Sequence, residues 1–243
     1  MTYTLLSVRE LAFSHENVSE SVLSTCSFDF HSGDVVGLLG ENGQGKTTLL
    51  DLLAGRLRPT GGSINWDKGY FLPSGGGIYL EQKLGGILLP WCTFNEHLRI
   101  FVRSNLGAAV GDGMREVARL VEPYANRPCG RLSGGESQLA GLLLAFSLNW
   151  DVALLDEPFI GIDRKRLPQI LRGLYQTLRQ PNKSALIVSH RLNTILFLCN
   201  RTLVLGGSAG ARIIDNPHQG DESLLSHVPG ELVAKYHEMI CHV

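Results

Sequence analysis

The strongest constraint on the fold is a glycine-rich segment between an apolar run and an apolar helical pattern. The segment reads Gly40-Glu41-Asn42-Gly43-Gln44-Gly45-Lys46-Thr47-Thr48. Residues 35–39 before it are apolar, and residues 49–53 after it place leucines at the spacing of one helix face. Strand, glycine-rich loop and helix is the context of the G-x-x-x-x-G-K-[ST] phosphate loop. The sequence therefore predicts a nucleoside triphosphate site.

Each residue type in this loop has a physical reason to be there. Gly43 and Gly45 carry no side chain, so backbone N–H groups can curl around phosphate oxygens. The helix that follows directs its positive end at the same anion. We expect Lys46 to neutralise the terminal phosphates and the Thr47 hydroxyl to reach Mg²⁺.

Bulk properties narrow the class of protein. The formal net charge is −1 and the pI is near 6.7, which argues against a nucleic-acid partner because there is no basic excess. The five cysteines are scattered and never spaced as C-x-x-C, which is typical of reduced thiols. The N-terminus lacks a signal-peptide pattern, and the longest apolar run, residues 139–146, is too short to cross a bilayer. We expect a soluble intracellular chain.

Periodicity indicates several further elements. Strand patterns cover residues 3–8, 25–30, 151–155 and 185–188. Helical periodicity covers about 93–127, which we interpret as an insertion in the nucleotide domain, and one amphipathic helix is expected after about residue 221. The cluster Ser74-Gly75-Gly76-Gly77 precedes no lysine or helix start, so we expect a hairpin turn there rather than a second phosphate cradle.

Two acidic residues follow the predicted strand at 151–155. Parallel α/β sheets bind ligands at the carboxyl ends of their strands, which is where Asp156 and Glu157 fall. Asp156 is expected to hold Mg²⁺ directly or through water, as a Walker B carboxylate does. Glu157 is placed to accept a proton from the attacking water.

The segment Leu132-Ser133-Gly134-Gly135-Glu136-Ser137-Gln138 makes the resemblance specific. With it, the chain from about residue 5 to 210 resembles an ATP-binding cassette (ABC) ATPase. The resemblance implies a single α/β domain: a P-loop NTPase core of the ABC type with an antiparallel β subdomain (about 1–82 and 132–215) and an α-helical subdomain (about 83–131). A C-terminal helix would occupy about 221–243.

The resemblance also implies roles for individual residues. Ser133, Gly134 and Gly135 would cap the γ-phosphate of ATP bound to a second subunit, so that the enzyme works as a head-to-tail dimer. His190 lies 34 positions after Asp156, as the family's switch histidine does, and would contact the γ-phosphate. Asp163 matches the D-loop aspartate, which couples the shared sites.

Two further positions are matched by their local sequence context. Gln82 is taken as the Q-loop glutamine that reaches the metal and the attacking water, although the segment after it is longer than usual. Ser74 has a similar local context but is not a glutamine. His15 stands where the family has an aromatic residue that stacks on adenine.

Three positions depart from the family pattern. Glu136 replaces the usual glutamine after the serine-glycine motif, and Leu139 and Leu144 stand where basic residues are common. We expect these changes to leave the phosphate contacts intact and to alter helix packing or a partner surface.

The resemblance implies an ATPase subunit of an ABC transporter, on the cytoplasmic face of the membrane. MgATP hydrolysis would drive separate transmembrane permease subunits docked near Gln82, with a substrate-binding protein if the system is an importer. Short segments are similar both to importers of nitrate, sulfonate or taurine type and to haem exporters, so the direction stays open. The alternatives are a non-transport ABC ATPase of translation, DNA repair or chromosome structure, and a regulatory module without turnover.

Overall fold

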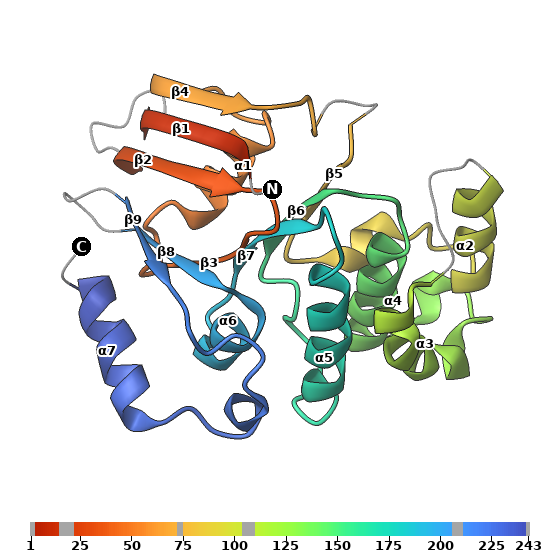
Figure 1. Ribbon diagram of the computed structural model, residues 1–243. Helices are drawn as coiled ribbons and strands as arrows, with labels where there is room; N and C mark the ends of the chain where they lie inside the picture. Colours follow the sequence, from red (N-terminus) through yellow and green to blue (C-terminus); the bar gives the residue numbers. More distant parts are fainter. Residues whose placement is uncertain (1–2, 15–21, 72–74, 104–109, 206–210, 242–243) are drawn as a thin grey trace.

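The chain folds into two β-sheets with helices packed around the larger one (Figure 1). The computed structural model describes residues 3–14, 22–71, 75–103, 110–205 and 211–241. Its strands are β1 (Thr4–Phe13), β2 (Leu23–His31), β3 (Val35–Leu39), β4 (Gly61–Trp66), β5 (Gly77–Leu80), β6 (Val152–Asp156), β7 (Ser184–Val188), β8 (Arg201–Leu205) and β9 (Ala211–Asp215). Its helices are α1 (Lys46–Leu53), α2 (Phe94–Arg103), α3 (Arg115–Val121), α4 (Gly134–Phe146), α5 (Leu167–Leu178), α6 (Leu192–Leu198) and α7 (Gly230–Cys241).

The larger sheet has six strands in the order β5-β6-β7-β3-β8-β9. All neighbours are parallel except β8 and β9. Its central strands are apolar throughout because both faces are covered. In β3, Val36 and Leu38 pack toward the small sheet and α1, while Val35 and Leu39 pack toward the helices on the other face. This confirms the predicted α/β fold with a buried parallel sheet.

The smaller sheet is antiparallel, with the order β2-β1-β4. Cys26, Phe28 and Phe30 alternate into the space between the two sheets, as the pattern predicts. Strand β1 runs well beyond the predicted residues 3–8. Glu10 takes a left-handed φ of 47° within an irregular stretch of the β1–β2 pairing, and this interrupts the alternation on which the prediction depends.

The hairpin turn predicted at Ser74–Gly77 is wrong. Strand β4 belongs to the small sheet and β5 to the large one, so the two strands do not pair with each other. The described part of this segment carries the chain from one sheet to the other, and the Gly77 N–H donates to the carbonyl oxygen of Tyr70 at 2.8 Å. Glycine content marks where a strand ends, but it does not tell which strand pairs next. Ser74 itself lies outside the described residues.

The predicted helical stretch at 93–127 contains α2 and α3, with short 3-10 helices around them (η1, Leu84–Ile87; η2, Asp112–Met114; η3, Glu122–Tyr124; η4, Cys129–Arg131). The division into subdomains at residues 83 and 131 remains a prediction. In the tail, the predicted helix begins at Gly230, after a 3-10 helix at Glu222–Leu225 (η5). None of the helices in the described ranges is long and apolar enough to cross a membrane.

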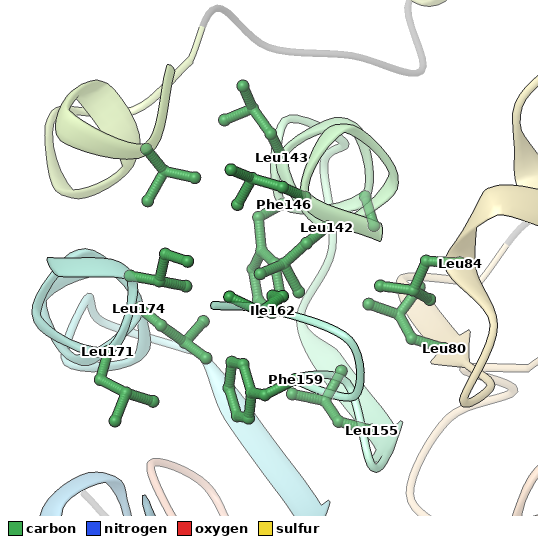
Figure 2. Packing of buried hydrophobic residues seen from close by; sticks show 14 of the residues in the cluster. Leu80, Leu84, Leu142, Leu143, Phe146, Leu155, Phe159, Ile162, Leu171 and Leu174 are labelled. Atoms are coloured by element: carbon green, nitrogen blue, oxygen red, sulfur yellow. The ribbon is translucent and has the colours of Figure 1, made fainter. Parts of the chain in front are cut away.

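A leucine-rich core fixes the segment that follows β6 (Figure 2). Figure 2 shows Phe159 and Ile162 together with leucines of α4 and α5. Both side chains are almost fully buried, with 2% and 6% of their surface exposed. Each contributes about 1.5–3 kcal/mol of burial free energy. Glu157 and Asp163, which lie on either side of Phe159 and Ile162 in the chain, are therefore held at fixed positions relative to the sheet.

Candidate nucleotide site

The loop between β3 and α1 has the backbone that its glycines predict. Gly43 and Gly45 have φ angles of 85° and 77°, in the left-handed region that side chains disfavour. A Cβ atom on Gly45 would also lie 2.8 Å from the carbonyl oxygen of Val22. Any other residue at position 45 would therefore distort the loop against β2.

Lys46 lies across the mouth of this loop. Its Nζ donates to the carbonyl oxygens of Gly40 and Glu41, both at 2.8 Å. The Gln44 Oε1 accepts a hydrogen bond from the Glu41 N–H at 2.6 Å, which braces the turn. Burial lowers the pKa of Lys46, while the charges of Glu157 and Asp156 oppose that fall. The ammonium is thus held where a phosphate chain inside the loop would meet it.

Asp156 ends β6 opposite the loop. Its side chain is 2% exposed, and its Oδ2 accepts the Thr47 hydroxyl at 2.7 Å. Its other oxygen, Oδ1, is buried and has no hydrogen-bond partner among the described residues. Burial raises the pKa of this carboxyl, and the hydrogen bond from Thr47 opposes the rise. An unpartnered carboxylate oxygen beside a hydroxyl fits a hard divalent cation such as Mg²⁺.

Glu157 follows in a strained conformation. Its φ is 48°, rare for a residue with a long side chain, and its N–H donates to the Val188 carbonyl at 3.1 Å. The side chain is 7% exposed and its Oε1 has no hydrogen-bond partner among the described residues. Burial raises its pKa to about 7. The His190 Nε2 lies 3.4 Å from this oxygen, on a side chain that is 56% exposed.

These groups line one cleft, which has a volume of about 290 Å³. The predicted site residues that line it are Asn42, Gly43, Gly45, Lys46, Thr47, Thr48, Gln82, Asp156, Glu157 and His190. Gln82 therefore lies at this cleft, where the residue is exposed. Gly40, Glu41 and Gln44 build the loop behind the lining. His15 lies outside the described residues.

The serine-glycine segment lies elsewhere. Ser133 is the N-cap of α4, and neither it, Gly134, Gly135 nor Asp163 lines the cleft of its own chain. A Cβ on Gly135 would lie 2.8 Å from the Gly161 carbonyl, so the tip of α4 packs against the segment that carries Asp163. These four residues form a second group, separate from the cleft.

The departures from the family pattern have structural reasons. The Ser133 Oγ accepts the Glu136 N–H, and Glu136 Oε2 accepts the Ser133 N–H at 2.8 Å, which makes a reciprocal capping box. Glu136 also pairs with Arg127. Leu139 and Leu144 are 1% and 2% exposed and belong to the core. The acidic residue thus stabilises the helix start, and the leucines pack inside.

Sequence reasoning missed Gln138. Its buried amide Nε2 donates to the carbonyl oxygens of Gln82 at 2.9 Å and Pro158 at 3.1 Å, and its Oε1 accepts the Leu84 N–H at 3.0 Å. It therefore ties the tip of α4 to both Gln82 and the Glu157 segment. The available signal was an amide side chain on the buried face of an apolar helix.

Comparisons with known proteins agree with this geometry. The family model described as ABC transporter matches residues 23–160, more than half of the chain. The taurine import ATP-binding protein TauB of Pseudomonas aeruginosa is 32% identical over 84% of this chain and 78% of its own length. The aliphatic sulfonates import ATP-binding protein SsuB of Granulibacter bethesdensis is 34% identical over 82% and 80%.

Solved structures support the fold. An ATP-binding subunit of an ABC transporter superposes with a TM-score of 0.75 at 24% identity, covering 97% of this chain and 99% of that one. The post-hydrolysis dimer of the cassette MJ0796, bound to ADP and phosphate, gives 0.70 at 20% identity, covering 87% and 98%. The phosphate loop, the acidic pair after β6 and the capped serine-glycine helix thus occur together in a chain that belongs to the ATP-binding cassette family of transporter ATPases.

Proposed function

We propose that two copies of this chain, or this chain and a similar one, close head to tail on ATP and drive separate transmembrane subunits. The proposal rests on one observation: the polar site residues lie in two separate places on the chain. Lys46, the Thr47–Asp156 pair and Glu157 converge on one cleft, while Ser133 lies outside it. The cleft would bind the triphosphate, and a partner's serine-glycine tip would complete it.

In the proposed mechanism the chain positions water and charge. Lys46 and the loop N–H groups bind the phosphate oxygens, because they are fixed donors in a recess. Thr47 and Asp156 would hold Mg²⁺, which would neutralise negative charge on the triphosphate. Glu157 accepts the proton of the attacking water, and Gln82 and His190 orient that water. A carboxyl with a pKa of about 7 changes charge near neutral pH, as a general base requires.

The second group then completes the site from the opposite chain. The Ser133 hydroxyl and the N–H groups of Gly134 and Gly135 lie at the start of α4, where the helix dipole favours an anion. Asp163, on the segment packed against that tip, would couple the two shared sites. Loss of the γ-phosphate on hydrolysis would release the interface.

A groove beside the nucleotide cleft offers a docking place for the transmembrane subunits. It has a volume of about 430 Å³ and shares Thr47, Gln82 and Asp156 with the cleft. The Arg56 guanidinium lies 4.3 Å from the centre of the Tyr79 ring and pairs with Glu81. Trp91, 72% exposed, follows in the chain. An exposed tryptophan close in sequence to Gln82 suits a partner that senses the nucleotide.

We further propose import as the direction and the cytoplasmic face of the membrane as the place of action. Import is the activity in the names of the relatives TauB and SsuB, which match more than four fifths of this chain. The non-transport alternative has no comparable support from the comparisons.

The experiment is purification of the tagged chain from detergent-solubilised membranes of its native cell. The wild type should carry stoichiometric transmembrane subunits, and Trp91→Glu should lose them while keeping its own ATP binding. Val233→Glu, at another exposed apolar residue, is the matched control. Recovery of the wild-type chain free of membrane subunits would contradict the transport proposal.

A further inference from the structure

A second polar cleft lies beside the segments that carry His190 and Asp163. It has a volume of about 420 Å³ and lies between the start of α5, the start of α6 and η5. Its lining residues are Arg164, Leu167, Pro168, Leu171, Arg191, Asn193, Leu225 and Ser226. None of them lines the nucleotide cleft.

The charged residues that line this cleft are all positive. Two arginines line it, together with the neutral donors Asn193 and Ser226, and no lining residue is acidic. Neither arginine side chain forms an ion pair or hydrogen bond with a residue that the structure describes, whereas Arg172 on α5 pairs with Glu222 at 2.7 Å. Guanidinium groups match the geometry of phosphate-type oxyanions.

The remaining wall is apolar. The apolar lining residues are Leu167, Pro168 and Leu171 of α5 and Leu225 of η5. Leu167 and Leu171 are almost fully buried, so Pro168 and Leu225 present most of the apolar surface. Clefts of 300–1,000 Å³ with an apolar lining and a few placed polar groups are typical of small-molecule sites. This one has room for a doubly charged oxyanion attached to a small hydrocarbon body.

We propose that this cleft binds a small organic phosphate, held by Arg164 and Arg191, and that its occupation slows ATP hydrolysis. Arg191 directly follows His190, and Arg164 directly follows Asp163. An oxyanion that bridges the two arginines restrains both segments at once. The regulatory part rests on the proposed function of His190 and Asp163, whereas the binding part does not.

Binding is tested in the full chain with the Lys46→Ala substitution, which removes the lysine contact of the phosphate loop. Phenyl phosphate is titrated by calorimetry, with inorganic phosphate and sulfate as comparison ligands at constant ionic strength. We expect Arg164→Gln and Arg191→Gln each to weaken phenyl phosphate binding roughly tenfold, because each substitution removes the charge-assisted hydrogen bonds of one guanidinium. Arg58→Gln, at an exposed arginine on another part of the surface, should leave binding unchanged.

The comparison ligands distinguish the possible sources of the oxyanion. Phenyl phosphate should bind more tightly than inorganic phosphate, because its ring can contact Pro168 and Leu225, the half-buried apolar residues of the lining. Equal binding in the parent, both arginine variants and Arg58→Gln would overturn the proposal, as would loss in all three variants. The two arginine substitutions are measured separately, so poor folding of one leaves the other informative.

Regulation is tested in the chain with Lys46 intact. Phenyl phosphate should lower kcat for ATP hydrolysis without raising KM, and Arg191→Gln should abolish this inhibition. A rise in KM alone would mean competition in the nucleotide cleft and would overturn the regulatory claim. Because the binding assay needs no turnover, a failure of the proposed ATPase mechanism would leave its result interpretable.

Discussion

The nucleotide cleft and the tip of α4 differ in how their polar groups are satisfied. In the cleft, buried oxygens of Asp156 and Glu157 have no hydrogen-bond partner among the described residues. At the tip of α4, Ser133 and Glu136 accept each other's backbone N–H in a reciprocal capping box. A site that leaves buried acceptors unsatisfied is poised for a ligand, whereas a capped helix start is already stable. The two groups are therefore unlike, and in the proposed dimer each would find its complement on another chain.

The largest effect should come from Glu157, which we propose as the general base in the cleft. Glu157→Gln removes the proton acceptor but keeps the size of the side chain, so turnover should fall by about 10²- to 10⁴-fold. ATP binding should persist and ATP-bound dimers should accumulate. Phosphate release and light scattering measure the two effects, with Glu238→Gln on α7 as the control. Unchanged turnover would remove Glu157 from the role of base.

The next largest effect tests the nucleotide cleft alone, through the ATP affinity of the single chain. Lys46→Ala should weaken ATP binding to the single chain by roughly 10- to 100-fold, because charge-assisted hydrogen bonds contribute about 1.5–3 kcal/mol. Fluorescent nucleotide titration of the monomer measures it. An affinity equal to wild type would show that the ammonium does not contact the phosphates.

The matching change on the other side is Ser133→Asp. Aspartate is as good an N-cap as serine, so the helix start should stay stable. Its charge would repel a γ-phosphate from the opposite chain, so dimers should fail to form with ATP while monomer affinity stays at the wild-type value. A fall in monomer affinity would place Ser133 in the cleft of its own chain.

Gln138 joins the two halves, and its loss should have a moderate effect. Gln138→Leu leaves the Leu84 N–H and the Gln82 and Pro158 carbonyls without their partner, which should cost about 1–3 kcal/mol of stability. Turnover should fall more than ATP affinity, because Gln82 and the Glu157 segment lose their link. Urea unfolding and steady-state kinetics check this, with Gln176→Leu on the exposed face of α5 as the control.

The last prediction concerns the pH dependence of stability in the nucleotide-free chain, which leaves turnover untouched. Burial raises the pKa of Glu157 from 4.5 to about 7, so the folded state binds its proton more tightly than the unfolded state. This contribution is present below the unfolded pKa and is lost as the pH rises through about 7. The stability gain of Glu157→Gln over wild type should therefore grow between pH 4.5 and about 7 and then level off. A gain that is constant with pH in urea unfolding would contradict the buried carboxylate.

The phosphate loop and the acidic pair after β6 could be predicted from the sequence, because each depends on a few residue types at fixed spacing. The phosphate loop needs glycine at Gly45 for its φ and lysine at Lys46 for its charge, and both requirements are local. The acidic pair after β6 was predicted for the same reason. The left-handed φ of Glu157, and the burial that raises its pKa, are not encoded by any local pattern.

The rest depended on contacts between distant segments. Gln138 bonds to residues 54 and 56 positions earlier, so its role is visible only after folding. The pairing of β4 and β5 with different sheets is likewise a tertiary choice. The cleft at Arg164 and Arg191 forms where α5, α6 and η5 meet, and none of these segments carries a motif for it.

The most direct test of the divided site is complementation between two defective chains in the Glu157→Gln background. One chain carries Lys46→Ala and keeps its serine-glycine tip, while the other carries Ser133→Asp and keeps its phosphate loop. Neither should dimerise with ATP alone. We predict that the mixture forms heterodimers that retain one ATP each, because one composite site is intact. A mixture that stays monomeric and holds no more nucleotide than its separate components would contradict the head-to-tail account.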